Sequence, residues 1–127
     1  MTMPRDLRDD ADALALAGAF WEIAEDYETR GRRALAGCSF SRGTALRHAA
    51  WSLRRLADRL AIQSWSAGID GEDLAAFSNA DLAVQNVAHW FDYERPRVDA
   101  VRHHIATQQL IARSSAVAFD GVDAPDD

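Results

Sequence analysis

The sequence contains no lysine, only one cysteine and three prolines, and no long hydrophobic run. The single cysteine, Cys38, cannot form a disulfide within the chain, so we expect the fold to be stable without a covalent cross-link. No apolar segment approaches the roughly 20 residues that a membrane-spanning helix needs. The N-terminal residues are charged and contain no apolar region like that of a signal peptide. These absences favour a cytoplasmic protein without a membrane partner.

The charged residues are strongly segregated along the chain. All 14 basic residues are arginines, and the formal net charge is −6, which opposes bulk attraction to nucleic acid. Residues 31–60 contain 7 basic residues and 1 acidic residue, whereas residues 1–30 contain 3 and 8, and residues 61–127 contain 4 and 11. A basic middle segment therefore lies between two acidic flanks. Arginine suits ion-paired and stacked sites, because its planar guanidinium offers several donors at once.

The composition favours a helical protein of one domain. Of the 127 residues, 48% are hydrophobic, which is enough for a packed core without disulfides or metal. Alanine, leucine and arginine are abundant, and proline occurs only at positions 4, 96 and 125. Apolar residues recur at helical spacing in four segments, which we predict to be helices over residues 10–27, 41–66, 71–93 and 96–115.

Short connections separate these predicted helices. The segments at 37–43 and 67–73 contain glycine with serine or aspartate and predict loops, and Gly31 threatens the first helix beyond residue 27. Four amphipathic helices joined in this way predict an all-α, roughly four-helix bundle. The expected organisation has a lead-in, a single helical domain and an acidic, poorly ordered tail, over residues 1–9, 10–115 and 116–127.

The segment at residues 89–104, HWFDYERPRVDAVRHH, concentrates aromatic, arginine and histidine side chains. One interpretation is structural: Pro96 begins a new helix, and Asp99 stabilises the positive end of its dipole. A second interpretation is catalytic. The spacing from Arg97 to His103 resembles the short arginine–histidine motif of the HEPN family of helical ribonucleases, and His104 fits a slightly longer version of it.

This resemblance covers the segment 97–103 and the general shape of a bundle. It implies a metal-independent ribonuclease in which His103 acts as acid and base and Arg97 holds the phosphate. Those roles suit the two residue types, because histidine titrates near neutral pH and arginine binds phosphate with two hydrogen bonds. The sequence departs from the family at Val98, where the family usually has a polar residue.

The histidines also suggest a metal or small-ligand site in the bundle. Bundle metals are typically held by inward-facing glutamates and by Glu-x-x-His pairs, and no such pair occurs here. The ladder Glu22, Glu25 and Glu28 lies opposite the apolar stripe of the first predicted helix, where Glu28 can instead pair with Arg32. We therefore predict no metal and no cofactor. The histidines concerned are His48, His89, His103 and His104.

Several large aromatic residues fall outside the predicted apolar stripes. Trp51 lies among arginines in the second predicted helix, and Trp90 and Tyr93 project away from the third stripe. Such residues are covered by the chain itself, for example by segment 117–119, or they bind a partner. Tryptophan and arginine are enriched at interface hot spots. The candidate partner-binding residues are Arg47, Trp51, Arg54, Arg55, Arg59, Trp90 and Tyr93.

We predict a non-enzymatic protein-interaction module that binds another protein or a second copy of itself. The acidic outer face of the first helix and the basic outer face of the second would suit a homodimer. Single-stranded nucleic acid stacked on Trp51 is an alternative that the net negative charge opposes. By analogy of size and composition, such a protein acts as an inhibitor, an antitoxin or immunity protein, or a phage-encoded antagonist. The HEPN-like ribonuclease and the metal- or ligand-binding bundle are the competing functions.

Overall fold

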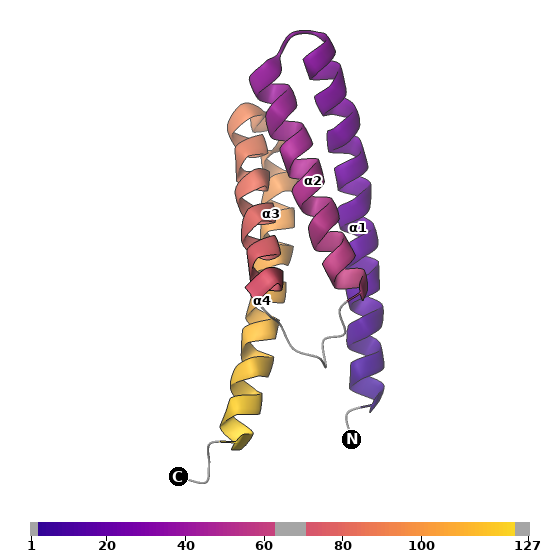
Figure 1. The fold of residues 1–127 in the computed structure, drawn as a ribbon, viewed down its shortest axis with the longest axis vertical. Helices are drawn as coiled ribbons and strands as arrows, with labels where there is room; N and C mark the ends of the chain where they lie inside the picture. The colour runs from indigo at the N-terminus through magenta and orange to yellow at the C-terminus, as the bar shows by residue number, and fades with distance from the viewer. Residues whose placement is uncertain (1–2, 63–70, 124–127) are drawn as a thin grey trace.

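The computed structural model describes residues 3–62 and 71–123, and these form four helices and one short 3₁₀ turn. The order along the chain is α1 (Met3–Ala36), α2 (Phe40–Ile62), α3 (Gly71–Trp90), the 3₁₀ turn η2 (Asp92–Glu94) and α4 (Arg95–Asp123). Successive helices run antiparallel, so both ends of the chain lie at the same end of the bundle (Figure 1). The predicted all-α, four-helix bundle is confirmed.

The helix boundaries differ from the predicted ones in three places. α1 begins before residue 10 and continues through Gly31 to Ala36, because that glycine lies in a helix–helix contact that stabilises the helical conformation. α3 ends at Trp90, and η2 leads directly into α4 ahead of Pro96. α4 continues past residue 115 to Asp123 and so includes part of the segment predicted as a tail. The predicted end of the second helix, residues 63–66, lies outside the described residues.

The loop between α1 and α2 is shorter than predicted. The amide of Gly37 donates to the carbonyl of Arg33 at 3.0 Å, and the amide of Ser39 donates to that of Ala34 at 2.8 Å, which closes the end of α1. Cys38 adopts a positive φ of 65°, the left-handed conformation that commonly terminates a helix. The carbonyl of Ser39 then accepts from the amide of Gly43 at 2.9 Å, so residues 41–43 belong to α2 and not to a loop.

Two glycines allow α1 and α2 to approach closely near this loop. A Cβ atom added to Gly43 would lie 2.6 Å from Cγ of Leu35 and 3.0 Å from the carbonyl oxygen of Gly31. A Cβ atom added to Gly31 would lie 2.7 Å from Cγ of Arg47. No side chain larger than hydrogen fits at either position unless the neighbouring side chain or backbone shifts. The glycine that threatens helix continuity in the sequence is therefore required by packing.

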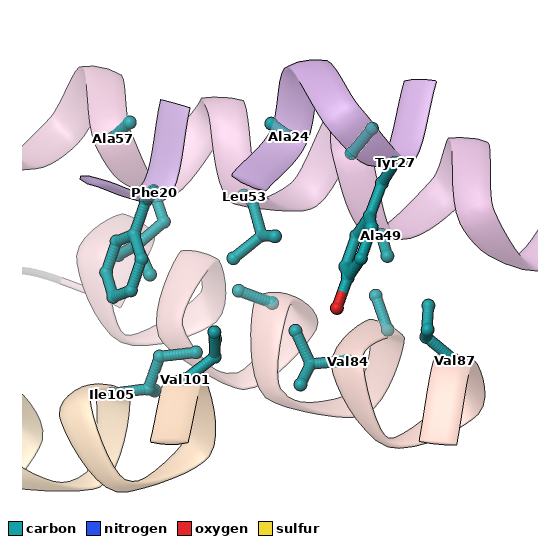
Figure 2. Packing of buried hydrophobic residues seen from close by; sticks show 14 of the residues in the cluster. Phe20, Ala24, Tyr27, Ala49, Leu53, Ala57, Val84, Val87, Val101 and Ile105 are labelled. Carbon is teal, nitrogen blue, oxygen red and sulfur yellow. The ribbon is translucent and has the colours of Figure 1, made fainter. Parts of the chain in front are cut away.

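The core lies between two layers, with α1 and α2 in one and α3 and α4 in the other (Figure 2). The apolar stripe predicted for the second helix is confirmed, because Leu46, Leu53, Leu56 and Leu60 are all buried. Figure 2 shows side chains from all four helices meeting between the layers, among them Phe20, Ala24, Tyr27, Ala49, Leu53, Ala57, Val84, Val87, Val101 and Ile105.

Charged side chains join α1 to η2 and α4. We call Asp26, Arg30, Glu94 and Arg97 the ion cluster. Nη1 of Arg30 lies 2.8 Å from Oε1 of Glu94, and Nη1 of Arg97 lies 2.7 Å from Oδ2 of Asp26. Arg30 also lies 3.3 Å from Asp26, as the i,i+4 spacing allows, and Arg97 lies 3.7 Å from Glu94. Each arginine thus contacts both carboxylates, and the cluster connects residues on distant parts of the chain.

The ion cluster and the adjacent core shift the pKa values of Asp26 and Tyr27. Burial alone would raise the pKa of Asp26, but hydrogen bonds from Arg97 and Arg30 outweigh it and hold the pKa below the usual 3.8. Tyr27 is fully buried, and burial together with the nearby charge of Glu94 raises its pKa to about 12. The guanidinium of Arg97 lies 5.2 Å from the centre of its ring. Asp26 is therefore charged and Tyr27 neutral at physiological pH.

Gly43→Ala tests the close approach of α1 and α2. We expect a loss of about 1–2 kcal/mol in the free energy of unfolding, because the steric cost exceeds the gain in helix propensity. Urea unfolding followed by circular dichroism measures the change. Gly18→Ala is the matched control, since a Cβ atom there meets nothing within 4 Å and should be neutral or stabilising. Equal stability of the wild type and Gly43→Ala would contradict the packing argument.

Glu94→Ala tests the ion cluster. The Glu94 side chain is only 10% exposed, and its loss leaves Arg30 with Asp26 as its remaining carboxylate partner. We expect the free energy of unfolding to fall by about 2 kcal/mol, as for other partly buried ion pairs that lose one member. Arg95→Ala is the control, because among the described residues Arg95 pairs only with the exposed Asp92, at 4.0 Å, and its loss should change stability by less than about 0.5 kcal/mol. Similar losses from both variants would contradict a special role for the cluster.

Candidate functional site

The predicted partner-binding residues do not form one surface. Arg47, Trp51 and Arg54 line a single groove beside α1, and Arg55 lies over the Trp51 ring. Arg59 instead pairs with Asp73 and Glu72 of α3. Trp90 and Tyr93 lie at the turn between α3 and α4, where the Tyr93 hydroxyl accepts a hydrogen bond from Arg30 at 3.0 Å. The α2 residues around Trp51 therefore form a group separate from Arg59 and from Trp90 and Tyr93.

An open groove runs between the C-terminal half of α1 and the N-terminal half of α2. Its volume of about 530 Å³ lies within the range of small-ligand sites, although the groove is not enclosed. The i,i+4 and i+7 spacing of the α2 residues places them on one side of that helix, away from the buried leucines. We call this site the α1/α2 groove. Its lining residues are Glu28, Arg32, Leu35, Thr44, Arg47, His48, Trp51 and Arg54.

Glu28 lies at the base of the groove and is shared by three arginines. Its side chain is 14% exposed, and its carboxylate oxygens lie 2.7 Å from Nε of Arg32, 3.3 Å from Nε of Arg47 and 3.4 Å from Nη1 of Arg54. Arg54 has a second partner in Glu25, at 2.8 Å. The predicted pairing of Glu28 with Arg32 is present, and the crossing of α2 adds Arg47 and Arg54 and makes the surroundings of Glu28 a partly buried cationic site.

The three guanidiniums also affect the ionisation of Glu28. The hydrogen bond from Arg32 lowers the pKa of Glu28, burial raises it by less, and the charges of Arg47 and Arg54 lower it further. The net pKa lies below the usual 4.5, so Glu28 stays ionised down to acidic pH.

Trp51 forms one wall of the groove and remains half exposed, at 53%. The guanidinium carbon of Arg55 lies 5.1 Å from the ring centre, and the His48 ring stacks beside it at 6.4 Å. Trp21 on α1 is also exposed, with the guanidinium of Arg54 at 5.5 Å from its ring. Trp51 and Trp21 therefore each contact one arginine and remain partly exposed.

Three groove residues from α1 were not among the predicted site residues, namely Glu28, Arg32 and Leu35. One feature of the sequence could have identified them: residues 1–30 are mainly acidic and residues 31–60 mainly basic, which favours pairing of the two segments. That pairing occurs within one chain. It uses the charges that would otherwise support the predicted homodimer.

Arg97 and His103, the residues of the HEPN-like motif, lie in different surroundings. Arg97 is held by Asp26 and Glu94 in the ion cluster. His103 lines a second open depression, between α3 and α4, whose other polar residues are Asp81, Asp99, Arg102 and Gln109.

His104 is exposed, and its ring contacts that of His103 edge to face at 6.2 Å. Within the described residues no hydrogen bond, ion pair or ring contact joins either histidine to Arg97.

The described residues contain no group of three or more histidine, cysteine, aspartate or glutamate side chains that could hold a metal ion. None of the described helices combines the length and apolar character needed to cross a membrane. Comparisons with protein-family models, curated proteins and solved structures found no match to this chain. The function must therefore be inferred from the residues of the site itself.

Glu28→Gln tests the electrostatics of the groove. Because the pKa of Glu28 is lowered on folding, its stabilising contribution is complete above about pH 4.5 and is lost as the pH falls through the folded-state value. We expect the variant to be less stable than the wild type at pH 7 by about 1 kcal/mol and to differ less at about pH 3.

The free energy of unfolding in urea, measured at both pH values, gives this difference. Glu22→Gln is the matched control, since Glu22 is exposed and forms no ion pair with the described part of the chain. A stability gap between wild type and Glu28→Gln that stays constant with pH would rule out the assigned role of this carboxylate.

Proposed function

We propose that the protein is a non-enzymatic interaction module that binds another macromolecule through the α1/α2 groove and Trp51. One observation carries this proposal. Trp51 is half exposed beside the groove with Arg55 against its ring, while the apolar stripe of the same helix is fully buried elsewhere. Burying Trp51 against a partner would remove a large apolar surface from water without disturbing the core.

The surroundings of Trp51 match those of binding hot spots. Tryptophan and arginine dominate hot spots because they combine large contact area with hydrogen-bond donors. The ring is already oriented by Arg55 and His48, so less side-chain freedom is lost when a partner binds. A rigid helical scaffold that presents such a residue is suited to covering a site on another protein.

By analogy of size and composition, we propose an inhibitor, antitoxin, immunity protein or phage-encoded antagonist as the kind of protein concerned. We also propose a cytoplasmic location, which fits the exposed free thiol of Cys38, since thiols persist in reducing compartments. The ribonuclease alternative has less support, because Arg97 is held by Asp26 and Glu94 and no contact among the described residues joins it to His103 or His104.

Affinity purification from the source organism with quantitative mass spectrometry tests the interaction. The baits are the wild type, Trp51→Ala and Trp90→Ala, the last a control because Trp90 is 40% exposed but lies at the turn end of α3. We expect one partner to be enriched by the wild type and the control, and to be reduced about 10-fold or more with Trp51→Ala.

Sedimentation of the same three proteins covers the case in which the partner is a second copy. Wild type and Trp90→Ala should then form a dimer that Trp51→Ala does not. Equal recovery of every partner by Trp51→Ala, with no self-association that depends on Trp51, would refute the proposal.

A further inference from the structure

The α1/α2 groove contains more positive than negative charge. Three arginines and one glutamate line it, and the glutamate, Glu28, is shared by all three. Even if Arg54 is assigned to Glu25, Arg32 and Arg47 still share a single carboxylate. Their side chains are 72% and 50% exposed, so water and solutes reach them. The groove is therefore a local cationic site on a chain whose net charge is −6.

Most donors of these two exposed arginines are unused. Both Arg32 and Arg47 contact Glu28 through Nε. Within the described residues, no hydrogen bond or ion pair uses the terminal nitrogens of either side chain. Each guanidinium has five N–H donors, so several on each arginine are available to an acceptor from outside. Glu28 fixes both guanidiniums by one edge and leaves the other edge free.

The rest of the groove is suited to an apolar side chain. Leu35 of α1 is half buried, the Trp51 ring of α2 is half exposed, and both side chains line the groove. Glu28 and Leu35 are two helical turns apart, a distance of about 10 Å, which about three residues of an extended peptide would span. An occupant therefore needs acceptors and a large apolar group within a few residues of each other.

We infer that the α1/α2 groove binds an acidic peptide segment of a protein partner. One or two carboxylates of the segment accept hydrogen bonds from Arg32 and Arg47, and a large apolar side chain within a few residues of them packs on Trp51. Carboxylates match the guanidinium edge with two parallel hydrogen bonds, and opposite charge accelerates and orients the encounter. This inference rests on the proposed function and specifies its partner.

The surrounding charge favours a peptide over a nucleic acid. A nucleic-acid strand requires a basic track along several phosphates, and Glu25 and Glu28 lie directly beside the arginines here. A short peptide with one or two carboxylates places its negative charge only at Arg32 and Arg47. The chain's net charge of −6 opposes a longer polyanion but acts weakly on such a segment, because salt screens distant charges.

Selection of a random peptide library against the full-length protein tests this inference. We expect enriched peptides to carry aspartate or glutamate within a few residues of a large apolar side chain. Synthetic copies of these peptides, with the acids changed to their amides, should bind about 10-fold more weakly by fluorescence anisotropy, and raising the salt concentration should weaken the acidic forms.

Variants of the protein locate the binding site. Arg47→Glu should weaken peptide binding about 10-fold or more, and Arg95→Glu, an exposed arginine at the start of α4, should leave it unchanged. Since Arg47→Glu adds a carboxylate beside Glu28, Arg47→Gln provides a milder variant, and circular dichroism checks that both are folded.

Four results would overturn the inference: no enrichment of any peptide, enriched peptides without acidic residues, binding that ignores both Arg47 variants, or preferential binding of a single-stranded RNA oligonucleotide. The Trp51 and Arg47 variants together distinguish a failure of this inference from a failure of the proposed function. If the cellular partner is lost with Trp51→Ala but kept with both Arg47 variants, the acidic-peptide class is wrong and the interaction function stands. If neither residue affects any partner, both proposals fail.

Discussion

The close approach of α1 and α2 at Gly31 and Gly43 determines the most distinctive part of this structure. With hydrogen in place of a side chain, the stem of Arg47 lies against the α1 backbone at Gly31. That position brings the Arg47 guanidinium to within 3.3 Å of Glu28. A wider separation of the helices would remove the shared carboxylate and, with it, the groove. The close contact at Gly31 and Gly43 and the candidate binding groove therefore both depend on the same packing of α1 against α2.

Electrostatics then divides the arginines into two groups. Some are used by the fold, as in the ion cluster and the pair between Arg59 and Asp73, where they connect one helix to another helix or to η2. Others are only partly neutralised, because Arg32 and Arg47 share Glu28. Arginines of the first group stabilise the bundle, because each is held by a carboxylate from another helix or turn. Those of the second group retain hydrogen-bonding capacity, and for that reason they carry the functional proposals.

The segment from residue 89 to residue 104 shows why residue type alone does not identify a site. Its aromatic and charged side chains form a corner in which Arg30 contacts Glu94 and Tyr93, and Arg97 contacts Asp26. Arg97 therefore has a structural role that accounts for its conformation, while His103 lies with a different set of side chains between α3 and α4. The spacing of two residues in a motif indicates a shared site only when the fold places their side chains together.

The helical class, the four helices and the buried stripe of α2 could be predicted from the sequence alone. These features depend on helix propensity and on the spacing of apolar residues within one segment. The sequence also identified Trp51 and Arg47 as residues outside the core. Three features are visible only in the tertiary structure. They are the ends of α1 and α4, the contact of Gly31 with α2, and the place of Glu28 in the groove. Those features depend on which residues of separate helices meet, and the spacing of residues along one chain carries no direct information on that pairing.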